Sequence, residues 1–274
     1  INATIESNAD SLVVDEKKEF MQPTVSSSEK KLSDYAPMLA QTFSKREKYI
    51  KFPCFVQPKL DGTRCIAITG VGLMTRQMKL YPHLDPIKKV IDALPPGTIL
   101  DGELYSHTMN FQQIVGLVKK QKLTDTDISN LHQIYLFVYD TQMDLPMQDR
   151  LQFLEKLFDI YKNDATFNQA LKLLPTFMCK SKEEMLKIHD QFTADKYEGI
   201  ILRNLRGLYK VGYRSNDLQK HKVFMDEDFK IVGYDHGEGI EQDLIIFICE
   251  TENGDRFNVR PAGSHEMRRS MLKN

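Results

Sequence analysis

The stretch PKLDGTR, residues 58–64, places a lysine, an Asp-Gly pair and an arginine between two apolar runs, CFV (54–56) and CIAI (65–68). Asp-Gly between apolar segments is the strongest short-range signal for a tight turn between two strands. The string K-x-D-G-x-R arises by chance about once in 10⁵ start positions. The turn alone does not explain the lysine. Either Lys59 is a solvated residue at a strand end, or the turn presents it for chemistry.

The composition is that of an ordinary globular protein. Of the 274 residues, 27% are charged and 41% hydrophobic, and the net charge of −1 predicts no polyanionic partner. A nucleic-acid surface must therefore come from local clustering of basic residues. The four cysteines form no CxxC pair, which argues against a zinc site or a disulfide framework and favours a reducing, intracellular setting.

No membrane or secretory segment is expected. The longest uninterrupted apolar run, LIIFIC (244–249), is far too short to span a bilayer. The first residues, INATIESNADSLVVDEKK, lack a basic segment followed by an apolar one, so no signal for secretion is expected. The expected location is intracellular.

The order of patterns along the chain predicts a mixed α+β fold with three parts. Residues 1–35 are polar and Ser-rich and are expected to form a flexible N-terminal arm; 36–225 mix helical and strand patterns; 226–274 are β-rich. Helices are expected at 85–94, 111–118, 150–161 and 181–192, the last after a capping box at Ser181 and Glu184. Strands are expected within 50–75 and at 98–105, 133–140, 197–204, 217–224, 229–235, 244–251 and 256–261.

Three further stretches place charged residues on or beside predicted strands. They are LDGEL (100–104) with Glu103, YEGIILR (197–203) with Glu198, and DLQKHK (217–222) with Lys220 and Lys222. The i, i+2 spacing of the two lysines puts both ammonium groups on one face of a strand. Considered singly, each of these residues is as easily explained as a solvated strand end or a charged sheet edge.

As an ordered series, these stretches resemble the motifs of the covalent nucleotidyltransferase superfamily, which comprises ATP-dependent DNA ligases, RNA ligases and mRNA capping enzymes. PMLA (37–40) ahead of the lysine, LDGELY (100–105) and FQ (111–112) most resemble the ATP-dependent DNA ligases of the compact viral and phage type. The resemblance covers about residues 37–272. It implies a nucleotidyltransferase (adenylation) domain of antiparallel sheets flanked by helices at 36–225. An OB-fold, apparently incomplete, follows at 226–274.

The resemblance also implies roles for single residues. Lys59 is the expected nucleophile that becomes covalently adenylated, and Arg64 the expected contact to the ribose and later to the nick phosphate. The remaining expected ligands of ATP or AMP are Glu103 near the ribose, Phe137 stacked on the purine, Lys220 and Lys222 on the α-phosphate, and Arg76. Arg76 departs from the pattern, because Met78 stands where the family usually has a glycine. Glu103 and Glu198 are the expected ligands of Mg²⁺, for which Mn²⁺ could substitute.

These residue types suit that chemistry. A lysine attacks phosphorus only as the neutral amine, which neighbouring cations and partial burial favour. Cations also absorb the charge that develops on the α-phosphate. Carboxylates suit a hard divalent cation, which prefers oxygen ligands. Phe137 could equally be a core residue.

The expected function is therefore that of an ATP-dependent DNA ligase, a monomer that seals 5′-phosphate/3′-hydroxyl nicks in duplex DNA during replication, repair and recombination. Two alternatives stay open: an RNA ligase or GTP-dependent mRNA capping nucleotidyltransferase, and a non-catalytic nucleic-acid-binding module.

The absence of G-x-x-x-x-G-K-[ST] argues against a P-loop enzyme, and HEMRR (265–269) is not a zinc motif. The family's last motif, an Arg and a Lys that orient pyrophosphate, does not follow RSMLKN (269–274). Basic residues at 45, 46, 48 and 51 could meet DNA phosphates or form a solvated helix face.

Overall fold

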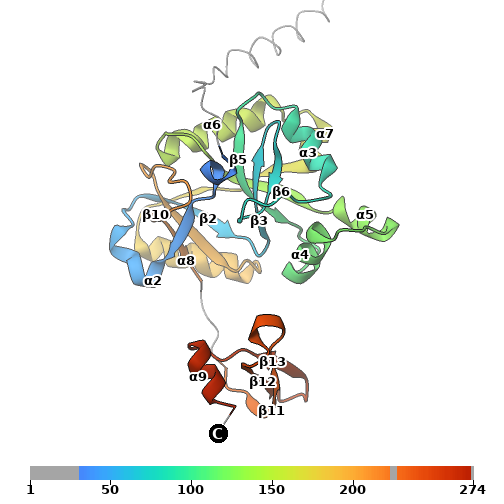
Figure 1. Ribbon diagram of the computed structural model, residues 1–274. Coiled ribbons are helices and arrows are strands. Elements are labelled where there is room, and N and C mark those ends of the chain that lie inside the picture. The colour runs from blue at the N-terminus through green and yellow to red at the C-terminus, as the bar shows by residue number, and fades with distance from the viewer. Residues whose placement is uncertain (1–30, 223–226, 273–274) are drawn as a thin grey trace, which may run out of the picture. The chain divides into compact units, whose positions relative to one another are not determined.

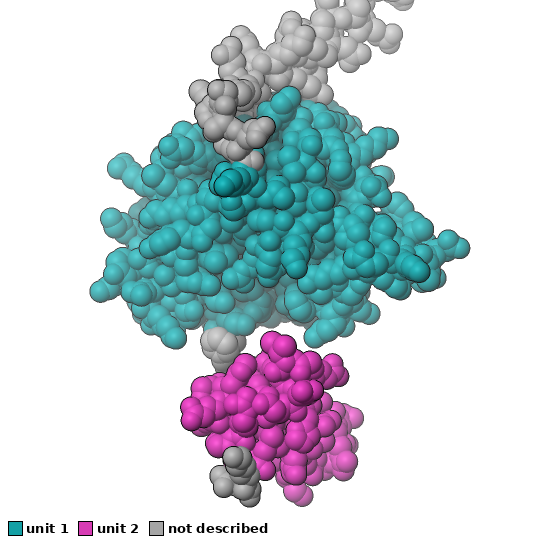
Figure 2. Space-filling model, viewed as in Figure 1, with its two compact units in different colours: residues 1–223 teal, residues 224–274 magenta. Residues whose placement is uncertain are grey.

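The structure is a computed structural model that describes residues 31–222 and 227–272. The chain divides into two compact units, residues 1–223 and 224–274 (Figure 2). The expected N-terminal arm lies outside the described residues except for its last five, of which Leu32–Tyr35 form a short 3-10 helix, η1. Strands and helices are interspersed along the chain (Figure 1), which confirms the predicted mixed α+β class.

The first unit contains two five-stranded sheets. The first sheet has the order β1-β10-β9-β2-β8, with β1 parallel to β10 and the other neighbours antiparallel. Its strands are β1 (Leu39–Thr42), β2 (Cys54–Lys59), β8 (Phe177–Cys179), β9 (Gly199–Asn204) and β10 (Arg214–His221). The second sheet has the order β4-β3-β5-β6-β7, with only β6 and β7 parallel. Its strands are β3 (Thr63–Ile68), β4 (Gly72–Met74), β5 (Ile99–Tyr105), β6 (Tyr135–Thr141) and β7 (Leu171–Leu173).

The Asp-Gly pair connects these two sheets. It does join two strands, as predicted, but β2 pairs with β8 and β9 whereas β3 pairs with β4 and β5. The connection is therefore not a β-hairpin. A Cβ at Gly62 would lie 2.4 Å from the carbonyl oxygen of Leu104 and 2.8 Å from Cγ of Glu103, so only glycine fits where the chain crosses against β5.

Helices flank the two sheets, and α5 packs on α4 at the periphery (Figure 1). They are α2 (Phe43–Arg46) with the 3-10 helix η2 (Glu47–Tyr49), α3 (Asp85–Asp92), α4 (Phe111–Lys119), α5 (Asp125–Leu131), α6 (Met147–Ile160), α7 (Ala165–Ala170) and α8 (Lys182–Ala194). Helix α8 begins where the sequence predicts, because the side chain of Ser181 accepts a hydrogen bond from the backbone N–H of Glu184. Among the described residues, no helix combines the length and the apolar character that crossing a bilayer requires.

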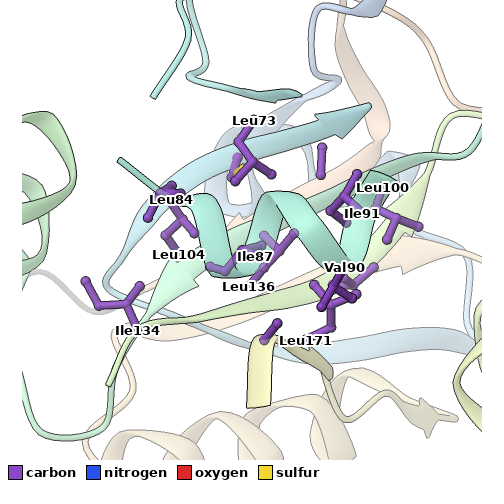
Figure 3. Packing of buried hydrophobic residues seen from close by; sticks show 14 of the residues in the cluster. Leu73, Leu84, Ile87, Val90, Ile91, Leu100, Leu104, Ile134, Leu136 and Leu171 are labelled. Carbon is purple, nitrogen blue, oxygen red and sulfur yellow. The ribbon is translucent and has the colours of Figure 1, made fainter. Parts of the chain in front are cut away.

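The largest core lies between α3 and the second sheet (Figure 3). Helix α3 buries Ile87, Val90 and Ile91, the apolar positions at its predicted spacing, against Leu100 and Leu136 on β5 and β6. A second core packs α8 and α2 against the first sheet. Its buried members include Phe43, Val56, Met185, Ile200 and Leu202. With their outer faces covered in this way, the two sheets hold the residues between them in fixed positions.

The second unit contains a three-stranded antiparallel sheet of order β11-β12-β13. Its elements are β11 (Lys230–His236), the 3-10 helix η3 (Gly239–Glu241), β12 (Ile245–Glu250), β13 (Arg256–Val259) and α9 (His265–Ser270). Leu244, Ile245 and Cys249 are buried in this unit. An OB barrel has five strands, so the three described here are consistent with the expectation of a partial OB-fold.

Candidate active site

A cavity of about 390 Å³ lies in the first unit, lined by residues of both sheets. Of the site residues expected from the sequence, it is lined by Lys59, Arg64, Arg76, Glu103 and Lys220. Among the described residues, the charged side chains on its walls are Glu103, a carboxylate, and the cations Lys59, Arg64, Arg76, Lys119, Arg203, Arg214 and Lys220. Seven cations facing one carboxylate make this cavity suited to a polyanion such as a nucleoside triphosphate.

Lys59 is the last residue of β2 and ends at the cavity. Its ammonium group forms an ion pair with Oε2 of Glu198, whose Oε1 accepts a hydrogen bond from Nζ of Lys222 at 2.6 Å. The backbone N–H of Glu198 also donates to the carbonyl oxygen of Lys59 at 3.1 Å. Burial acts to raise the pKa of Glu198, but the hydrogen bonds from Lys222 and Lys59 outweigh it and lower that pKa. Glu198 is therefore an ionised anchor for two lysines.

Lys220 lies near Lys59 and Lys222, so the structure brings three of the predicted lysines together. Burial lowers the pKa of Lys220, and the positive charges of Lys59 and Lys222 lower it further. The sequence predicted that Lys220 and Lys222 share one face of a strand, but β10 ends at His221, so Lys222 lies just beyond it. Lys220 lines the cavity and Lys222 contacts Glu198 beside it.

Arg64 is held on one edge by Asp101 of the neighbouring strand β5. Its Nε and Nη2 donate to Oδ1 and Oδ2 of Asp101 at 2.6 and 2.5 Å, and Nη2 also donates to the carbonyl oxygen of Met38 at 3.0 Å. Asp101 is 1% exposed. A bidentate pair of this kind fixes the plane of the guanidinium, so Arg64 points into the cavity in one orientation.

Glu103 is the cross-strand partner of Arg64 in the β3–β5 pair. Burial raises the pKa of Glu103 to about 7, although Arg64, Lys59 and a hydrogen bond from the hydroxyl of Tyr139 all act to lower it. That hydroxyl lies 3.2 Å from Oε2 of Glu103. Glu103 therefore changes charge near neutral pH, in contrast with Glu198.

Phe137, the aromatic residue predicted to stack on the purine, is not among the residues that line the cavity in the described part of the chain. It is 9% exposed and packs edge-on against Tyr105, His107 and Tyr135. Tyr139, two residues further along β6, does line the cavity and lies 5.2 Å under the guanidinium of Arg64. The alternation of a strand places both residues on one face, but only Phe137 was predicted from the sequence.

A buried network of charges lies beneath the cavity. The carboxylate of Asp140 (0% exposed) accepts from Nε of Arg150 at 2.7 Å and from Nη1 of Arg203 at 2.5 Å. Nε of Arg203 donates to Oε1 of Gln57 at 2.7 Å, and Nε2 of Gln57 donates to the carbonyl oxygen of Tyr139 at 3.2 Å. Sequence reasoning missed Gln57 and Arg203 because they read as ordinary strand positions. Both line the cavity.

Two more cations line the cavity although the sequence did not predict them, and one predicted basic cluster does not line it. Lys119, at the end of α4, and Arg214, at the start of β10, line the cavity. Neither residue belongs to a motif, so nothing in the sequence indicated that it would reach the site. The basic cluster at 45, 46, 48 and 51 is exposed and does not line it.

The expected metal ligands do not form a cluster of protein groups. Among the described residues, no three or more His, Cys, Asp or Glu side chains are arranged to hold a metal ion. Glu198 pairs with Lys59, and Glu103 is near enough for Lys59 to lower its pKa. Mg²⁺ commonly takes one or two protein carboxylates, with substrate phosphates and water as the remaining ligands. The donor set thus fits Mg²⁺ bound together with a nucleotide.

The cavity between the two sheets presents Lys59 among several other cationic side chains. The ATP dependent DNA ligase domain matches residues 37–222. The DNA ligase of African swine fever virus (isolate Tick/South Africa/Pretoriuskop Pr4/1996) is 34% identical over 244 residues, covering 84% of this chain and 55% of the viral protein. The DNA ligase of Enterobacteria phage T4 is 25% identical, covering 73% of this chain and 51% of the phage protein.

Solved structures show the same fold. A structure described as "DNA binding with a minimal scaffold: Structure-function analysis of Lig E DNA ligases" has a TM-score of 0.70 and 23% identity, covering 86% of this chain and 87% of the other. The ATP-dependent DNA ligase from bacteriophage T7 in complex with ATP has a TM-score of 0.57 and 19% identity, with 87% and 84% covered.

This chain belongs to the ATP-dependent DNA ligase family, and the relatives named above include ligases of viruses and phages. It spans about half the length of those viral and phage ligases.

Proposed function

We propose that this protein is an ATP-dependent DNA ligase that seals 5′-phosphate/3′-hydroxyl nicks in duplex DNA through a lysyl-AMP intermediate. The observation that carries the proposal is the position of Lys59 at a cavity between two sheets, beside Glu198, Lys220 and Lys222. Family membership supports ATP as the nucleotide.

The reaction would proceed in three steps. The neutral amine of Lys59 attacks the α-phosphorus of ATP, a P–N bond forms, and the bond to pyrophosphate breaks. The AMP group then passes from Lys59 to the 5′-phosphate at the nick, which frees the lysine. Finally the 3′-hydroxyl attacks that 5′-phosphorus, which forms the phosphodiester bond and releases AMP. Lys220 and the arginines on the cavity wall would balance the charge on the phosphates in each step.

The base of the nucleotide would lie against Tyr139. The ring of Tyr139 lines the cavity together with the apolar side chains of Leu174 and Ile201, and aromatic faces stack well on purines. Phe137 remains the sequence-based candidate for this role, although it packs among other aromatic residues outside the cavity lining. Tyr139→Ala and Phe137→Ala compared for ATP binding separate the two assignments.

Glu103 and Glu198 would hold Mg²⁺, with Mn²⁺ as a possible substitute. When bound, the metal supplies Lewis-acid stabilisation of charge on the phosphate oxygens. Glu198 would have to release at least one of its two lysines to offer an oxygen. Releasing Lys59 would leave its amine free to turn toward the α-phosphate, so both events suit the first step.

The name DNA ligase, which the relatives carry, supports DNA as the substrate, and the remaining assignments are part of the proposal. The substrate partner would be nicked duplex DNA, the protein would act as a monomer inside the cell, and its roles would lie in replication, repair and recombination. The cationic wall of the cavity and the exposed basic residues at 45, 46, 48 and 51 are compatible with contacts to DNA phosphates.

The test is covalent labelling followed by a chase. The wild-type chain, Lys59→Ala and the exposed control Lys187→Ala, whose side chain is 75% exposed on α8, are incubated with Mg²⁺ and α-labelled ATP or GTP, then given nicked DNA or nicked RNA. Label on the wild type and on Lys187→Ala with ATP, none on Lys59→Ala, and sealing of nicked DNA are the expected results. Labelling by GTP alone, or sealing of RNA strands alone, would move the assignment to a capping enzyme or an RNA ligase. Equal labelling of Lys59→Ala would overturn it.

A further inference from the structure

Four segments that are distant in sequence meet in a closed ring of hydrogen bonds beside the cavity. Arg64 donates to Asp101, and the hydroxyl of Tyr209 donates to Oδ2 of the same carboxylate at 2.6 Å. The backbone N–H of Met38 donates to the Tyr209 hydroxyl at 3.2 Å, and the carbonyl oxygen of Met38 accepts from Arg64 at 3.0 Å. The ring is therefore closed by the backbone of Met38, whose N–H donates to Tyr209 and whose carbonyl oxygen accepts from Arg64.

This ring connects the two sheets. Arg64 and Asp101 belong to β3 and β5 of the second sheet. Met38 directly precedes β1, and Tyr209 lies between β9 and β10, all three being strands of the first sheet. The two segments on the first-sheet side are further joined by the hydrogen bond from the backbone N–H of Leu39 to the carbonyl oxygen of Tyr213, at 2.9 Å. The Tyr209 hydroxyl links the two sheets, because it donates to Asp101 of the second sheet and accepts from the N–H of Met38 beside the first.

The ring leaves one part of Arg64 available to a ligand. Nε and Nη2 are engaged by Asp101 and Met38, while within residues 31–222 and 227–272 no protein acceptor takes the Nη1 donor. Arg64 lines the cavity, as do Leu39 and Ala40, which follow Met38. Burial and the Asp101 carboxylate raise the pKa of Tyr209 well above its usual value, so its hydroxyl keeps the proton that it donates.

We propose that Tyr209 is a positioning residue: its hydroxyl closes the ring that orients Arg64 across the two sheets for contact with the bound nucleotide. Within the described residues, loss of the hydroxyl leaves Asp101 with Arg64 as its one side-chain donor. It also removes the acceptor of the backbone N–H of Met38, a residue that is 2% exposed. Arg64 and the wall at Leu39 then become free to shift relative to each other. The proposal rests on the nucleotide-binding role proposed above for this cavity.

The experiment compares Tyr209→Phe with Tyr213→Phe. Tyr213 is on the same loop and 57% exposed, so its substitution changes the same atoms without opening the ring. Each full chain is first treated with pyrophosphate and Mg²⁺ to remove any bound AMP. ATP binding is then measured by calorimetry in EDTA, where adenylation does not proceed. We expect Tyr209→Phe to weaken ATP binding about tenfold, and Tyr213→Phe to leave it within about twofold.

The same pair is then measured in an Arg64→Lys background, which keeps the charge but loses the bidentate fork. A positioning role predicts that Tyr209→Phe changes ATP binding less than about twofold in the Arg64→Lys background, because the guanidinium that Tyr209 orients is absent. A loss of equal size in both backgrounds indicates a general structural role and overturns the proposal, as does a result for Tyr209→Phe that matches Tyr213→Phe. Wild-type protein that binds ATP but forms no lysyl-AMP would refute the ligase assignment and leave this comparison intact. Wild-type protein that does not bind ATP would overturn both.

Discussion

The two glutamates beside Lys59 differ in charge near neutral pH because their surroundings differ. Glu198 is held by two ammonium groups, which lower its pKa in spite of burial. Glu103 faces Arg64 across a strand pair, yet burial dominates and raises its pKa to about 7. One carboxylate is thus a fixed charge and the other a titrating group, and metal binding at Glu103 should release a proton below neutral pH.

The raised pKa of Glu103 predicts how stability depends on pH. Because the folded pKa, about 7, exceeds the usual 4.5, the folded state binds more protons between these values. The stabilisation from Glu103 is therefore complete below pH 4.5 and is lost as the pH rises through 7. The free energy of unfolding of the wild type, relative to Glu103→Gln, should fall by on the order of 2 kcal/mol between about pH 5 and pH 8.

Urea unfolding of both proteins across that range measures this difference. Glu183→Gln serves as the control, because that carboxylate is 80% exposed on α8. A difference between wild type and Glu103→Gln that stays constant with pH would contradict the assignment of a titrating Glu103.

The family resemblance named single residues of the site, whereas packing decides which neighbouring side chains reach the cavity. Lys59, Arg64, Glu103 and Lys220 were named in this way, and all four line the cavity, while their roles stay predictions. The sequence could not predict that Tyr139, rather than Phe137, lines the cavity. Strand alternation places both on one face, and only the packing of neighbouring aromatic rings determines which one reaches the cavity.

At the scale of elements, the crossing from β2 to β3 depends on a glycine. A Cβ at Gly62 would meet the backbone of Leu104 at 2.4 Å, so Gly62→Ala must displace the turn that carries Lys59. Because small displacements of reacting groups are costly, we expect lysyl-AMP formation to fall at least about tenfold, with a loss of about 1–3 kcal/mol in unfolding free energy.

The control for this substitution is Gly116→Ala, within α4. A Cβ there meets nothing within 4 Å, and alanine favours a helix by about 0.5–1 kcal/mol over glycine. Unfolding midpoints and a single-turnover labelling assay on both variants check the prediction. Full labelling activity in Gly62→Ala would show that the turn tolerates displacement.

The buried ion network ties β6, α6 and β9 together. Asp140 is the shared acceptor for Arg150 and Arg203, which are 1% and 3% exposed. Asp140→Asn leaves two buried guanidinium groups without their negative charge, so we expect destabilisation of about 3–5 kcal/mol. Asp159→Asn, which disrupts an ion pair whose acid is 71% exposed, should cost less than about 1 kcal/mol. Denaturant unfolding of the two variants measures both values, and similar losses would argue against a special role for the buried network.

Most elements could be predicted from local patterns, but their pairing could not. The helices predicted at 85–94, 111–118 and 181–192 correspond to α3, α4 and α8. Short elements such as α5, α7 and β8 carried too few periodic residues to be recognised. Asp-Gly correctly indicated a turn between strands. Which strands pair is decided by long-range contacts, and these place β2 and β3 in different sheets.

At the scale of the whole molecule, the cavity that holds Lys59 belongs to one unit. Its lining residues in the described part of the chain all lie between Leu39 and Lys220, and the hydrophobic clusters that flank the two sheets also consist of residues of the first unit. The sequence predicted a change of domain at 225/226 from the change of pattern, and the compact units meet at 223/224. The internal structure of the β-rich tail was less predictable, because α9 had no clear helical pattern in HEMRRS.

The first unit alone should therefore bind the nucleotide. A fragment of residues 31–222 contains both sheets, their cores, the Tyr209 ring and all walls of the cavity. We expect it to fold cooperatively and to bind ATP within about threefold of the affinity of the full chain, since distant, independent parts contribute additively. Thermal unfolding with and without ATP, and calorimetry in EDTA, test this, with Lys59→Ala and Tyr209→Phe made in the fragment to confirm that the same site is measured. ATP binding that is lost in the fragment while its unfolding transition is kept would show that residues beyond 222 complete the nucleotide site.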